Sequence, residues 1–467
     1  MLEQSRLGET IVAVATASGP PAALALIRIS GSDTRGVLTR VLRYQRAADP
    51  PLPDRRPTVA WLLDPADGMP LDQILVTLFP APGSYTGEDL AELSLHGSPW
   101  VVAEALRILV AAGARAARAG EFTRRALANG KLDLSRAEAV AELTVAQSAR
   151  AAKLAVRHLT GELSQRYRLL RARLIEVAGL LEGPIEFPDD AAADEAWAFR
   201  EGLRVLGELG RELRALALSQ TLGRRVATGI HVPIVGRPNA GKSSLFNALL
   251  GSNRAITSPR PGTTRDTIEA ALALDGHVLR LVDTAGIEAS HDELVNEGVR
   301  RAEACVEEAD LVVLVLDASA PLSSADEAVT VRILAKPVVV VASKGDLGRR
   351  WDAAELERYG LRESVTVVSA VDGTGMEDLR RRLSAAVART VPVDDAPEAP
   401  VTSARQRGLL ERGAEEIARA QGNLKRGAVE LAVEDVRAAQ LALGEILGEV
   451  SSEDVLDRVF QSFCIGK

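Results

Sequence analysis

The spacing of apolar residues changes along the chain, and each change predicts a different kind of structure. Over residues 1–131, short apolar runs such as TIVAVATA and QILVTLF alternate with helical stretches, a mixture typical of an α+β domain. Over residues 132–221, Ala, Leu, Arg and Glu recur at helical spacing, and only EGPIEFPDD (182–190) interrupts them. We therefore predict long helices in this second region, with a break at its prolines and acidic residues.

Beyond Thr228 the apolar runs become short and unbroken, and helical stretches separate them. HVPIVG, VLRLVDTAG, ADLVVLVLD, KPVVVVAS and SVTVVSA are apolar on successive residues, as are strands of a parallel sheet that is covered on both faces. We predict an α/β domain over residues 222–390. A proline-rich, acidic linker follows (391–404), and helical spacing then returns up to residue 467. A nucleotide-sized domain inserted into a helical domain explains this order.

Composition narrows the class of protein. A chain of 467 residues should fold into roughly two to four domains, and 46% hydrophobic with 26% charged residues is typical of soluble globular proteins. The two cysteines, Cys305 and Cys464, form neither a disulfide framework nor a metal cluster and fit a reducing compartment. Since the sequence shows no secretory signal and no apolar run of about 18 residues, we expect a cytoplasmic protein that does not span a membrane.

A phosphate-binding motif follows the first of the unbroken apolar runs. GRPNAGKS (236–243) matches G-x-x-x-x-G-K-[ST] and precedes the helical stretch SSLFNALLG. Its glycines allow a loop whose backbone N–H groups turn toward phosphate oxygens at a helix N-terminus. Lys242 adds a positive charge, and the Ser243 hydroxyl is suited to ligate Mg²⁺. In this context the motif predicts a site for a nucleoside triphosphate.

Two further short motifs support this site. GTTRD (262–266) supplies a second hydroxyl for the metal, that of Thr264, on a loop that can order around a γ-phosphate. DTAG (283–286) ends a predicted strand, which would bring Asp283 near the waters of the metal and the Gly286 N–H near the γ-phosphate. Either motif alone would indicate only a turn at the end of a strand. Together with the phosphate-binding motif, they support the prediction of a nucleotide site.

The motif SKGD (343–346), at the end of the apolar run VVVVA, predicts the base. The Asp346 carboxylate can accept the protons on N1 and N2 of guanine, whereas adenine would offer it an acceptor. The Lys344 stem can lie along the base, and SA (369–370) can offer backbone N–H groups to the O6 oxygen. In this order the motifs resemble a Ras-like GTPase domain of the translation-factor-related kind. That family usually has Asn in place of Ser343, and because this Asn also steadies the phosphate loop, we expect its loss to weaken guanine binding.

Longer motifs elsewhere carry a second resemblance. They are ETIVAVAT (9–16), LIRISG (26–31), SYTGEDLAELSLHG (84–97), GEFTRRALANGKLDLSRAEAV (120–140), EFPDD (186–190) and the terminal FCIGK (463–467). With them the whole chain resembles the bacterial tRNA wobble-uridine modification GTPases, the MnmE (TrmE) family. The resemblance implies an α+β amino-terminal domain (1–131) that dimerises and binds 5-formyl-tetrahydrofolate or a related folate. It also implies a helical domain (132–221 and, with the linker and tail, 391–467) interrupted by a Ras-like P-loop GTPase domain (222–390).

The resemblance assigns folate contacts to Arg28, Glu92, Lys131 and Lys467. A carboxylate suits the donor edge of a pterin, and cations suit the glutamyl tail of a folate. Without the motifs, each of these residues would be interpreted as a solvated surface charge. The motif context favours the folate site.

The nucleotide and its metals would be held by residues from all of these loops. The GTP-binding residues would be Asn239, Ala240, Gly241, Lys242, Ser243, Ser244, Ser258, Thr263, Thr264, Asp283, Thr284, Ala285, Gly286, Ser343, Lys344, Asp346, Ser369 and Ala370. Ser243 and Thr264 would ligate Mg²⁺. The resemblance further implies K⁺, which activates hydrolysis between two GTPase domains where other GTPases use an arginine finger, with Asn239, Ser258, Arg260 and Thr263 as its ligands. The two prolines of SPRPG (258–262) depart from the usual loop of the family.

The residue that orients the attacking water stays open. Many Ras-like enzymes place Gln at the position of Ile287, whereas the family has Glu nine residues after the DTAG glycine, a count that reaches Val295. Glu293 and Glu297 flank this position, and a local shift could bring either into place. Both are candidate catalytic residues, and slow hydrolysis is the alternative.

Cys464 allows two interpretations. Its position mimics a prenylation box, but Gly466 is not aliphatic and Lys467 is not a usual terminal residue. It is either a small buried hydrophobe in a docked tail or, as the family resemblance implies, a thiol beside the one-carbon unit of the folate. A thiolate is a better nucleophile there than a hydroxyl, and we favour Cys464 as a candidate catalytic residue.

The resemblance implies a homodimer that works with an FAD-dependent partner of the MnmG/GidA type, in a heterotetramer or larger assembly. The pair would add an aminomethyl or carboxymethylaminomethyl group at carbon 5 of the wobble uridine of certain tRNAs. Because a net charge of −8 argues against general affinity for nucleic acid, tRNA would need a local basic surface. Two cation-rich stretches, 150–174 and 405–413, are candidates, although such a run is more often a solvated helix face. The rival function is a ribosome-assembly GTPase switch, which would need neither the folate motifs nor FCIGK.

Overall fold

The computed structural model describes residues 8–16, 21–44, 52–186, 195–251, 268–284, 304–361, 364–390, 399–461 and 463–466. The chain forms two compact units, and each unit draws on distant parts of the sequence. Unit 1 comprises Met1–Ala141, His158–Leu206 and Arg419–Lys467, and unit 2 comprises Glu142–Arg157 and Gly207–Ala418. Among the helices of the described residues, none is both long and apolar enough to cross a membrane.

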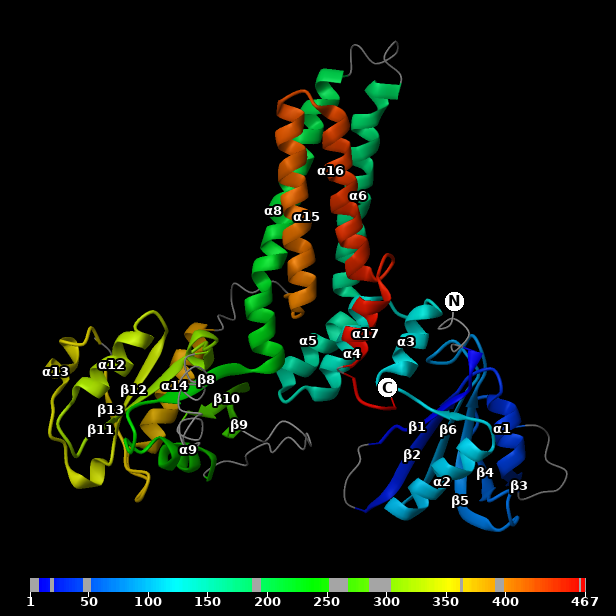
Figure 1. Cartoon of the computed structure of the whole chain (residues 1–467), viewed down its shortest axis with the longest axis horizontal. Coiled ribbons are helices and arrows are strands. Elements are labelled where there is room, and N and C mark those ends of the chain that lie inside the picture. Colours follow the sequence, from blue (N-terminus) through cyan, green and yellow to red (C-terminus); the bar gives the residue numbers. More distant parts are fainter. Residues whose placement is uncertain are drawn as a thin grey trace, which may run out of the picture. The chain divides into compact units, whose positions relative to one another are not determined.

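Unit 1 contains a seven-stranded sheet (Figure 1) with the strand order β3-β4-β5-β6-β2-β1-β7. All neighbouring strands are antiparallel except β7, which runs parallel to β1. The strands are β1 (Ile11–Val14), β2 (Ala22–Ser30), β3 (Leu42–Tyr44), β4 (Thr58–Leu63), β5 (Pro70–Phe79), β6 (Leu90–Gly97) and β7 (Arg115–Ala116). Two helices, α1 (Thr34–Val41) and α2 (Pro99–Ala111), complete the amino-terminal core.

The two faces of this sheet differ in burial. On β5, alternate residues Ile74, Val76 and Leu78 are buried in the core that includes α1 and α2, as a period of two requires. The opposite face exposes apolar side chains, among them Leu24 and Leu75. This second face, which we call the open face, also carries Arg28 of β2 and Glu92 of β6.

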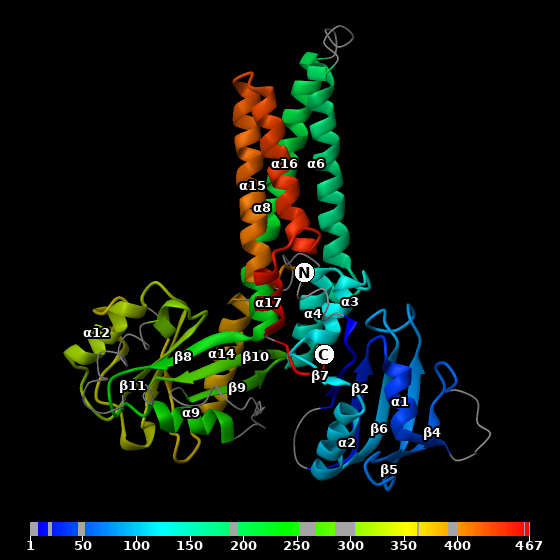
Figure 2. The same cartoon turned by 45° about the vertical axis from the view of Figure 1, so that its right-hand side comes forward.

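Long helices follow the amino-terminal sheet, as predicted, and they contribute to both units. Helix α16 packs along α6 (Figures 1 and 2), and ion pairs join Arg171 to Glu449 and Arg437 to Glu182. The helices are α3 (Glu121–Ala128), α4 (Leu134–Val145), α5 (Ala149–Leu159), α6 (Glu162–Glu186), α8 (Glu195–Thr228), α15 (Ala404–Lys425), α16 (Val429–Leu447) and α17 (Glu453–Gln461). The predicted break over 182–190 begins too early, because α6 extends to Glu186 within it. Helix α6 continues through Pro184 to Glu186, since a proline in the final turn interrupts only the last intrahelical bonds.

Unit 2 contains the predicted α/β sheet, in the order β13-β12-β11-β8-β10-β9. The strands from β13 to β10 are parallel, and β9 is antiparallel to β10. The strands are β8 (Ile230–Val235), β9 (Ile268–Leu274), β10 (His277–Asp283), β11 (Val312–Asp317), β12 (Val338–Ser343) and β13 (Thr366–Val367). The helices are α9 (Lys242–Gly251), α12 (Ser324–Ile333), α13 (Ala353–Glu357) and α14 (Met376–Thr390), with a 3-10 turn, η2 (Gly345–Leu347).

Apolar cores lie on both faces of this sheet. Val313 and Val315 of β11 belong to the core that contains residues of α9 and α14. Leu314 and Leu316, on the same strand, belong to the core that contains residues of α12 and α13. The unbroken apolar runs of the sequence therefore reflect strands that are buried on both sides.

Our sequence interpretation missed strand β9. Asp275 and Gly276, between β9 and β10, both have positive φ angles, 48° and 78°. Asp-Gly with two positive φ angles is the preferred two-residue hairpin turn. The dipeptide is visible in the sequence and could have predicted this edge hairpin.

Candidate functional site

The predicted phosphate loop, residues 236–241, joins the carboxyl end of β8 to α9. A Cβ atom at Gly236 would lie 2.2 Å from the carbonyl oxygen of Val315, so only glycine fits against β11 there. Gly241 has a φ of 94°, a backbone conformation that residues with a Cβ atom rarely adopt. The loop can thus turn sharply from the strand into the helix.

Lys242 lies inside this loop. It is 3% exposed, and its Nζ donates hydrogen bonds to the carbonyl oxygens of Gly236 at 2.6 Å and Arg237 at 3.2 Å. Lys242 is also the first residue of α9, so the N–H groups of the first helical turn lack carbonyl partners within the helix. A buried ammonium beside a helix N-terminus is suited to bind phosphate.

Oxygen ligands for a divalent cation lie at the same edge of the sheet. Ser243 is in the first turn of α9, and Asp283 is the buried last residue of β10, which pairs with β8 in parallel. The Thr284 hydroxyl donates to the carbonyl oxygen of Ile234 at 2.8 Å, which fixes the end of β10 beside β8. A hydroxyl and a carboxylate are ligands that Mg²⁺ prefers.

The predicted base loop, residues 344–348, follows β12. Lys344 has a φ of 56° and caps the turn η2, which carries the exposed Asp346. The Gly345 N–H donates to the carbonyl oxygen of Val368 at 2.9 Å, so the loop is attached to the segment that follows β13. Ser369, in that segment, is buried, and its Oγ accepts a hydrogen bond from the Val371 N–H at 3.3 Å.

Ser343 contacts the phosphate loop directly. Its hydroxyl is buried and lies in hydrogen-bonding range of the carbonyl oxygens of Ala240 and Leu316. A hydroxyl has only one proton to donate, so these two carbonyl oxygens compete for it. The serine that replaces the usual Asn therefore keeps a link to the phosphate loop.

Several predicted residues lie outside the described part of the chain. For the nucleotide and its metals they are Ser258, Arg260, Thr263, Thr264, Ala285 and Gly286, and for catalysis and folate binding they are Glu293, Glu297 and Lys467. Val295 is also outside it. The roles of these residues stay predictions.

In unit 1, Arg28 and Glu92 form an ion pair on the open face. Arg28 donates from Nε at 3.1 Å and from Nη2 at 2.7 Å, in both cases to Oε1 of Glu92. The guanidinium carbon of Arg28 lies 5.5 Å from the ring centre of Tyr85 and 5.9 Å from that of Phe122, within cation–π range. We call Arg28, Tyr85, Glu92 and Phe122 the Arg28 cluster.

The loop between β5 and β6 also binds Lys131. Lys131 Nζ donates to the carbonyl oxygen of Pro82 at 3.0 Å, and Asn129 donates to the carbonyl oxygen of Thr86 at 2.7 Å. The same loop contains Tyr85, whose hydroxyl is 2.9 Å from that of Thr123 on α3. Burial raises the pKa of Tyr85, so this hydroxyl stays protonated. One loop therefore contacts both Lys131 and Arg28.

A charged network, which the sequence interpretation missed, supports this loop. Arg125 of α3 is fully buried and donates to Glu88 at 2.9 Å and to Glu121 at 3.1 Å. Glu121 also accepts from Arg115 at 2.7 Å. Burial alone would raise the pKa of Glu121, but its hydrogen bonds to Arg115 and to the Arg118 N–H outweigh this effect and lower the pKa. Within the motif GEFTRRALANGK the sequence does not distinguish the buried arginine from its neighbour.

The carboxyl-terminal tail docks on unit 1. Phe463 is buried, and its ring centre lies 5.1 Å from that of Phe460. Gly120, with a φ of 65°, leaves room for both rings, because a Cβ there would lie 2.9 Å from Phe460 and 3.0 Å from Phe463. A Cβ on Gly466 would lie 2.1 Å from the carbonyl oxygen of Val14 at the end of β1.

The tail therefore ends close to the Arg28 cluster in the sheet. Val14 belongs to β1, and its neighbour Ala13 pairs in register with Arg28 of β2. Cys464 is exposed, and its carbonyl oxygen accepts a hydrogen bond from the Gly120 N–H at 3.3 Å. The interpretation of Cys464 as a small buried hydrophobe is wrong, because the neighbouring phenylalanine and glycine make the packing contacts.

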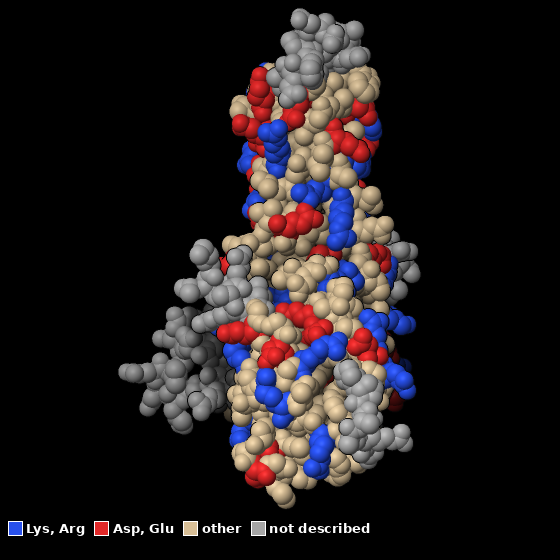
Figure 3. Space-filling model, turned by 90° about the vertical axis from the view of Figure 1, so that its right-hand side faces the viewer, with Lys and Arg blue, Asp and Glu red and all other residues tan. Residues whose placement is uncertain are grey.

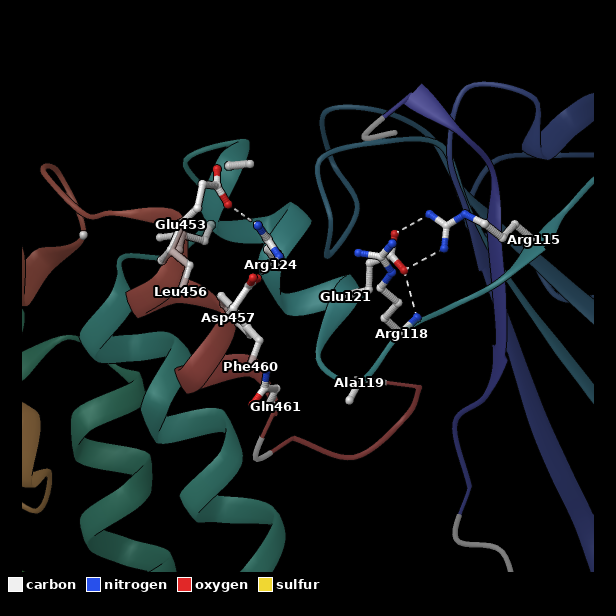
Figure 4. A pocket seen from close by; sticks show the side chains of 13 residues that line it. Arg115, Arg118, Ala119, Glu121, Arg124, Glu453, Leu456, Asp457, Phe460 and Gln461 are labelled. Atoms are coloured by element: carbon white, nitrogen blue, oxygen red, sulfur yellow. Dashed lines mark hydrogen bonds and ion pairs between the residues drawn. The ribbon is translucent and has the colours of Figure 1, made fainter. Parts of the chain in front are cut away.

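A cavity of about 510 Å³ lies beside the tail (Figure 4). It is lined by Arg115, Arg118, Ala119, Glu121, Arg124, Leu127, Ala128, Gly448, Glu453, Leu456, Asp457, Phe460 and Gln461. Arg124 pairs across it with Asp457 at 2.7 Å and also with Glu453 of α17. These pairs attach α17, and with it the tail, to α3.

The cation-rich stretches are less basic on the surface than in the sequence. Arg168 pairs with Asp133 at 2.7 Å, and Arg407 pairs with Glu411 at 2.8 Å. Figure 3 shows Lys and Arg interspersed with Asp and Glu over the face that it draws. In these two pairs the cation is matched by an acidic neighbour, as on a solvated helix face.

Two family models match the chain. The model described as GTP-binding protein TrmE N-terminus matches residues 10–131, and the model described as MnmE helical domain matches residues 134–464. The second match includes the whole inserted α/β domain and ends within the tail.

Curated relatives match over nearly the full length of the chain. A protein of Aquifex aeolicus is 39% identical over 98% of this chain and 100% of its own length. Proteins of Halorhodospira halophila and Moorella thermoacetica are 41% and 38% identical over 98% and 99% of this chain, and over 96% and 100% of their own lengths. Each of the three is named tRNA modification GTPase MnmE.

Proposed function

Because this chain belongs to the MnmE family of tRNA modification GTPases, we propose that it couples GTP hydrolysis to modification of the wobble uridine in certain tRNAs. The group added at carbon 5 would be aminomethyl or carboxymethylaminomethyl. The observation that carries this proposal is the docked tail, which brings Gly466 against β1, the strand that pairs with the strand of Arg28. A nucleotide switch alone would not need this arrangement.

The nucleotide half of the proposal rests on the loops of unit 2. Lys242 would stabilise negative charge on the β- and γ-phosphates, and Ser243 with Thr264 would ligate Mg²⁺, with Asp283 near the waters of the metal. The exposed carboxylate of Asp346 would accept the N1 and N2 protons of guanine. Mg²⁺ would neutralise charge on the transferring phosphoryl group.

We assign K⁺ a position beside the phosphate loop. Asn239 is exposed there with a φ of 61°, a conformation that Asn tolerates, and its amide oxygen is a suitable ligand for a monovalent cation. Ser258, Arg260 and Thr263 would complete the site. Hydrolysis should then be faster in K⁺ than in Na⁺, and equal rates in the two salts would remove Asn239 from this role.

Glu293 or Glu297 would orient the attacking water. Glu293→Ala and Glu297→Ala are compared with Val295→Ala as the matched control. Hydrolysis should be slower in one of the two glutamate variants, while the affinity for GTP stays unchanged. If neither glutamate variant is slower than the control, the water is oriented by another residue or by none.

The Arg28 cluster fits a folate in its chemistry. Arg28 donates both of its hydrogen bonds to Oε1 of Glu92, so Oε2 would accept from the donor edge of a pterin. Tyr85, which is partly buried, offers an aromatic ring beside the buried Phe122, and Lys131 and Lys467 would bind carboxylates of the glutamyl tail. A bound folate would supply the one-carbon unit, and Cys464 would lie near it as a nucleophile.

The open face supports a homodimer through the amino-terminal domain. Leu24 and Leu75 are 65% and 46% exposed on it, and apolar side chains on a sheet face are typically covered by another element or subunit. An FAD-dependent partner of the MnmG/GidA type would join this dimer in a heterotetramer or larger assembly. Because tRNA is the substrate, we place the protein in the cytoplasm.

The rival function is a GTPase switch in ribosome assembly. The tRNA nucleoside profile of a strain that lacks the gene distinguishes the two functions. We expect the C5 group of the wobble uridine to be missing in this strain and restored by the gene on a plasmid. An unchanged wobble uridine, with altered ribosomal subunit profiles, would favour the switch.

A further inference from the structure

Asp317 lies between the phosphate loop and the base loop. It is the last residue of β11 and pairs in register with Ser343, the last residue of β12. Its side chain is 8% exposed, and the residue lies at the carboxyl ends of the parallel strands β11 and β12. Ligands of such sheets bind at this edge, so Asp317 is close to the nucleotide loops although no motif above includes it.

On one side Asp317 holds the base loop. Its Oδ2 accepts a hydrogen bond from Lys344 Nζ at 2.8 Å. Lys344 has a left-handed backbone with a φ of 56°, which costs free energy in a residue other than glycine. Because Lys344 caps the turn that carries Asp346, anchoring its side chain also stabilises the direction of the base loop.

On the other side the same carboxylate faces the phosphate loop. Arg237, the second residue of that loop, has its Nη2 3.6 Å from Asp317 Oδ2. Arg237 Nε lies 3.4 Å from Asp326 Oδ1, at the start of α12. The arginine thus lies between two buried carboxylates at ion-pair distances, without a hydrogen bond from its Nε to any described residue, and Asp317 is the one that also contacts the base loop.

The surroundings of Asp317 favour its charged form. The N–H and hydroxyl of Ser319 donate to its Oδ1 at 2.9 and 2.6 Å. Burial alone would raise the pKa of Asp317, but the hydrogen bonds from Lys344 and Ser319 outweigh this effect and lower the pKa. The charged carboxylate accepts a hydrogen bond from Lys344 in the base loop and attracts Arg237 of the phosphate loop across 3.6 Å, both more strongly than a neutral group would.

We propose that Asp317 is a positioning residue for guanine nucleotides. By holding Lys344 and Arg237 together, it sets the separation between the base loop and the phosphate loop, and the nucleotide must contact both. The Ser343 hydroxyl makes a parallel link, since it contacts Ala240 in the phosphate loop from the neighbouring strand. Asp317 thus raises affinity without touching the nucleotide. This role concerns GTP binding alone and does not depend on the tRNA chemistry proposed above.

A double-mutant cycle tests the proposal. The affinity of the full chain for fluorescent GDP is measured in the wild type, in Asp317→Asn, in Lys344→Ala and in the double variant. We expect Asp317→Asn to weaken GDP binding about tenfold in the wild-type background, since the neutral amide loses the ionic part of the interaction with Lys344 and Arg237. In the Lys344→Ala background the same change should weaken binding by less than about threefold, because the partner is already missing.

Equal losses in the two backgrounds, or no loss in the wild-type background, would overturn the proposal. Asp378→Asn is the matched control, because Asp378 pairs with Arg382 at 3.0 Å on the exposed face of α14; it should bind GDP as the wild type does. Thermal unfolding is measured for each variant. If Asp317→Asn does not fold, Asp317→Ser takes its place in the same cycle, with the same expected coupling to Lys344.

Discussion

In unit 2 the predicted nucleotide contacts come from short loops that follow adjacent parallel strands. In unit 1 the Arg28 cluster combines side chains from β2, β6, a loop and α3, and the tail packs against β1, the strand beside β2. The phosphate loop offers mainly backbone groups fixed by two glycines, whereas the Arg28 cluster depends on side chains that strand register brings together. A loop of the first kind is encoded within a few successive residues, but a cluster of the second kind exists only after the sheet has formed.

This difference leads to predictions about which function each region loses. Changes in the nucleotide loops should abolish GTP turnover, and with it tRNA modification. Changes in the Arg28 cluster or the tail should abolish modification and leave GTP turnover intact.

The largest effect is expected for Lys242→Ala. The loop loses the ammonium that now bonds Gly236 and Arg237, so GTP turnover should be abolished. Steady-state phosphate release measures it. Lys425→Ala, at an exposed lysine of α15, is the control and should turn over GTP normally; turnover above a tenth of wild type in Lys242→Ala would contradict the role of the loop.

Asp346→Asn should exchange the base preference. An amide donates where the carboxylate accepted, so the ratio of affinities for GTP and xanthosine triphosphate should change by about a thousandfold in favour of the latter. Competition between the two nucleotides for one fluorescent probe measures this ratio. If GTP selectivity is unaltered, the base is not recognised by the SKGD loop.

Cys464→Ser should affect tRNA modification without affecting GTP turnover. The exchange is close to isosteric, and the backbone contact of Cys464 with Gly120 stays intact, so the tail should still dock. We expect tRNA modification to fall by about a hundredfold, because a hydroxyl is a poor substitute for a nucleophilic thiolate, with GTP turnover unchanged. Nucleoside analysis and phosphate release are measured on the same preparation, and preserved modification would limit Cys464 to a spacer role.

Arg28→Ala should have the smallest effect of these four. It leaves Glu92 without its partner at 2.7 Å and should weaken binding of 5-formyl-tetrahydrofolate about tenfold. Isothermal calorimetry measures this affinity. Arg43→Ala is the control, because it also removes an arginine from a strand of this sheet, at an exposed position of β3. Equal folate affinities in the two variants would contradict the assignment of the Arg28 cluster.

The sequence could predict the nucleotide loops because their function depends on glycine and lysine at fixed spacing. It could also predict the sheet that is covered on both faces, since the unbroken apolar run of β11 is buried at every position. The family resemblance, confirmed by the relatives, brought in Arg28 and Glu92, which no local pattern marks.

The other features depend on tertiary contacts. The pairing of Arg28 with Glu92 requires the register of β2 and β6, and the burial of Arg125 requires Glu88 and Glu121 around it. The exposure of Cys464 follows from where Phe463 and Gly466 pack. Composition suggested a buried cysteine because free cysteines are buried on average, but here the adjacent phenylalanine occupies the apolar site.

The central claim is that the nucleotide site and the Arg28 cluster with its tail serve one tRNA modification. It is tested most directly in a strain that lacks the gene and carries either Lys242→Ala or Cys464→Ser on a plasmid, with the modified wobble uridine of its tRNA measured by mass spectrometry. We predict that neither variant restores the C5 group, although only Lys242→Ala loses GTP turnover. Restoration of the modified uridine by either variant would contradict the claim.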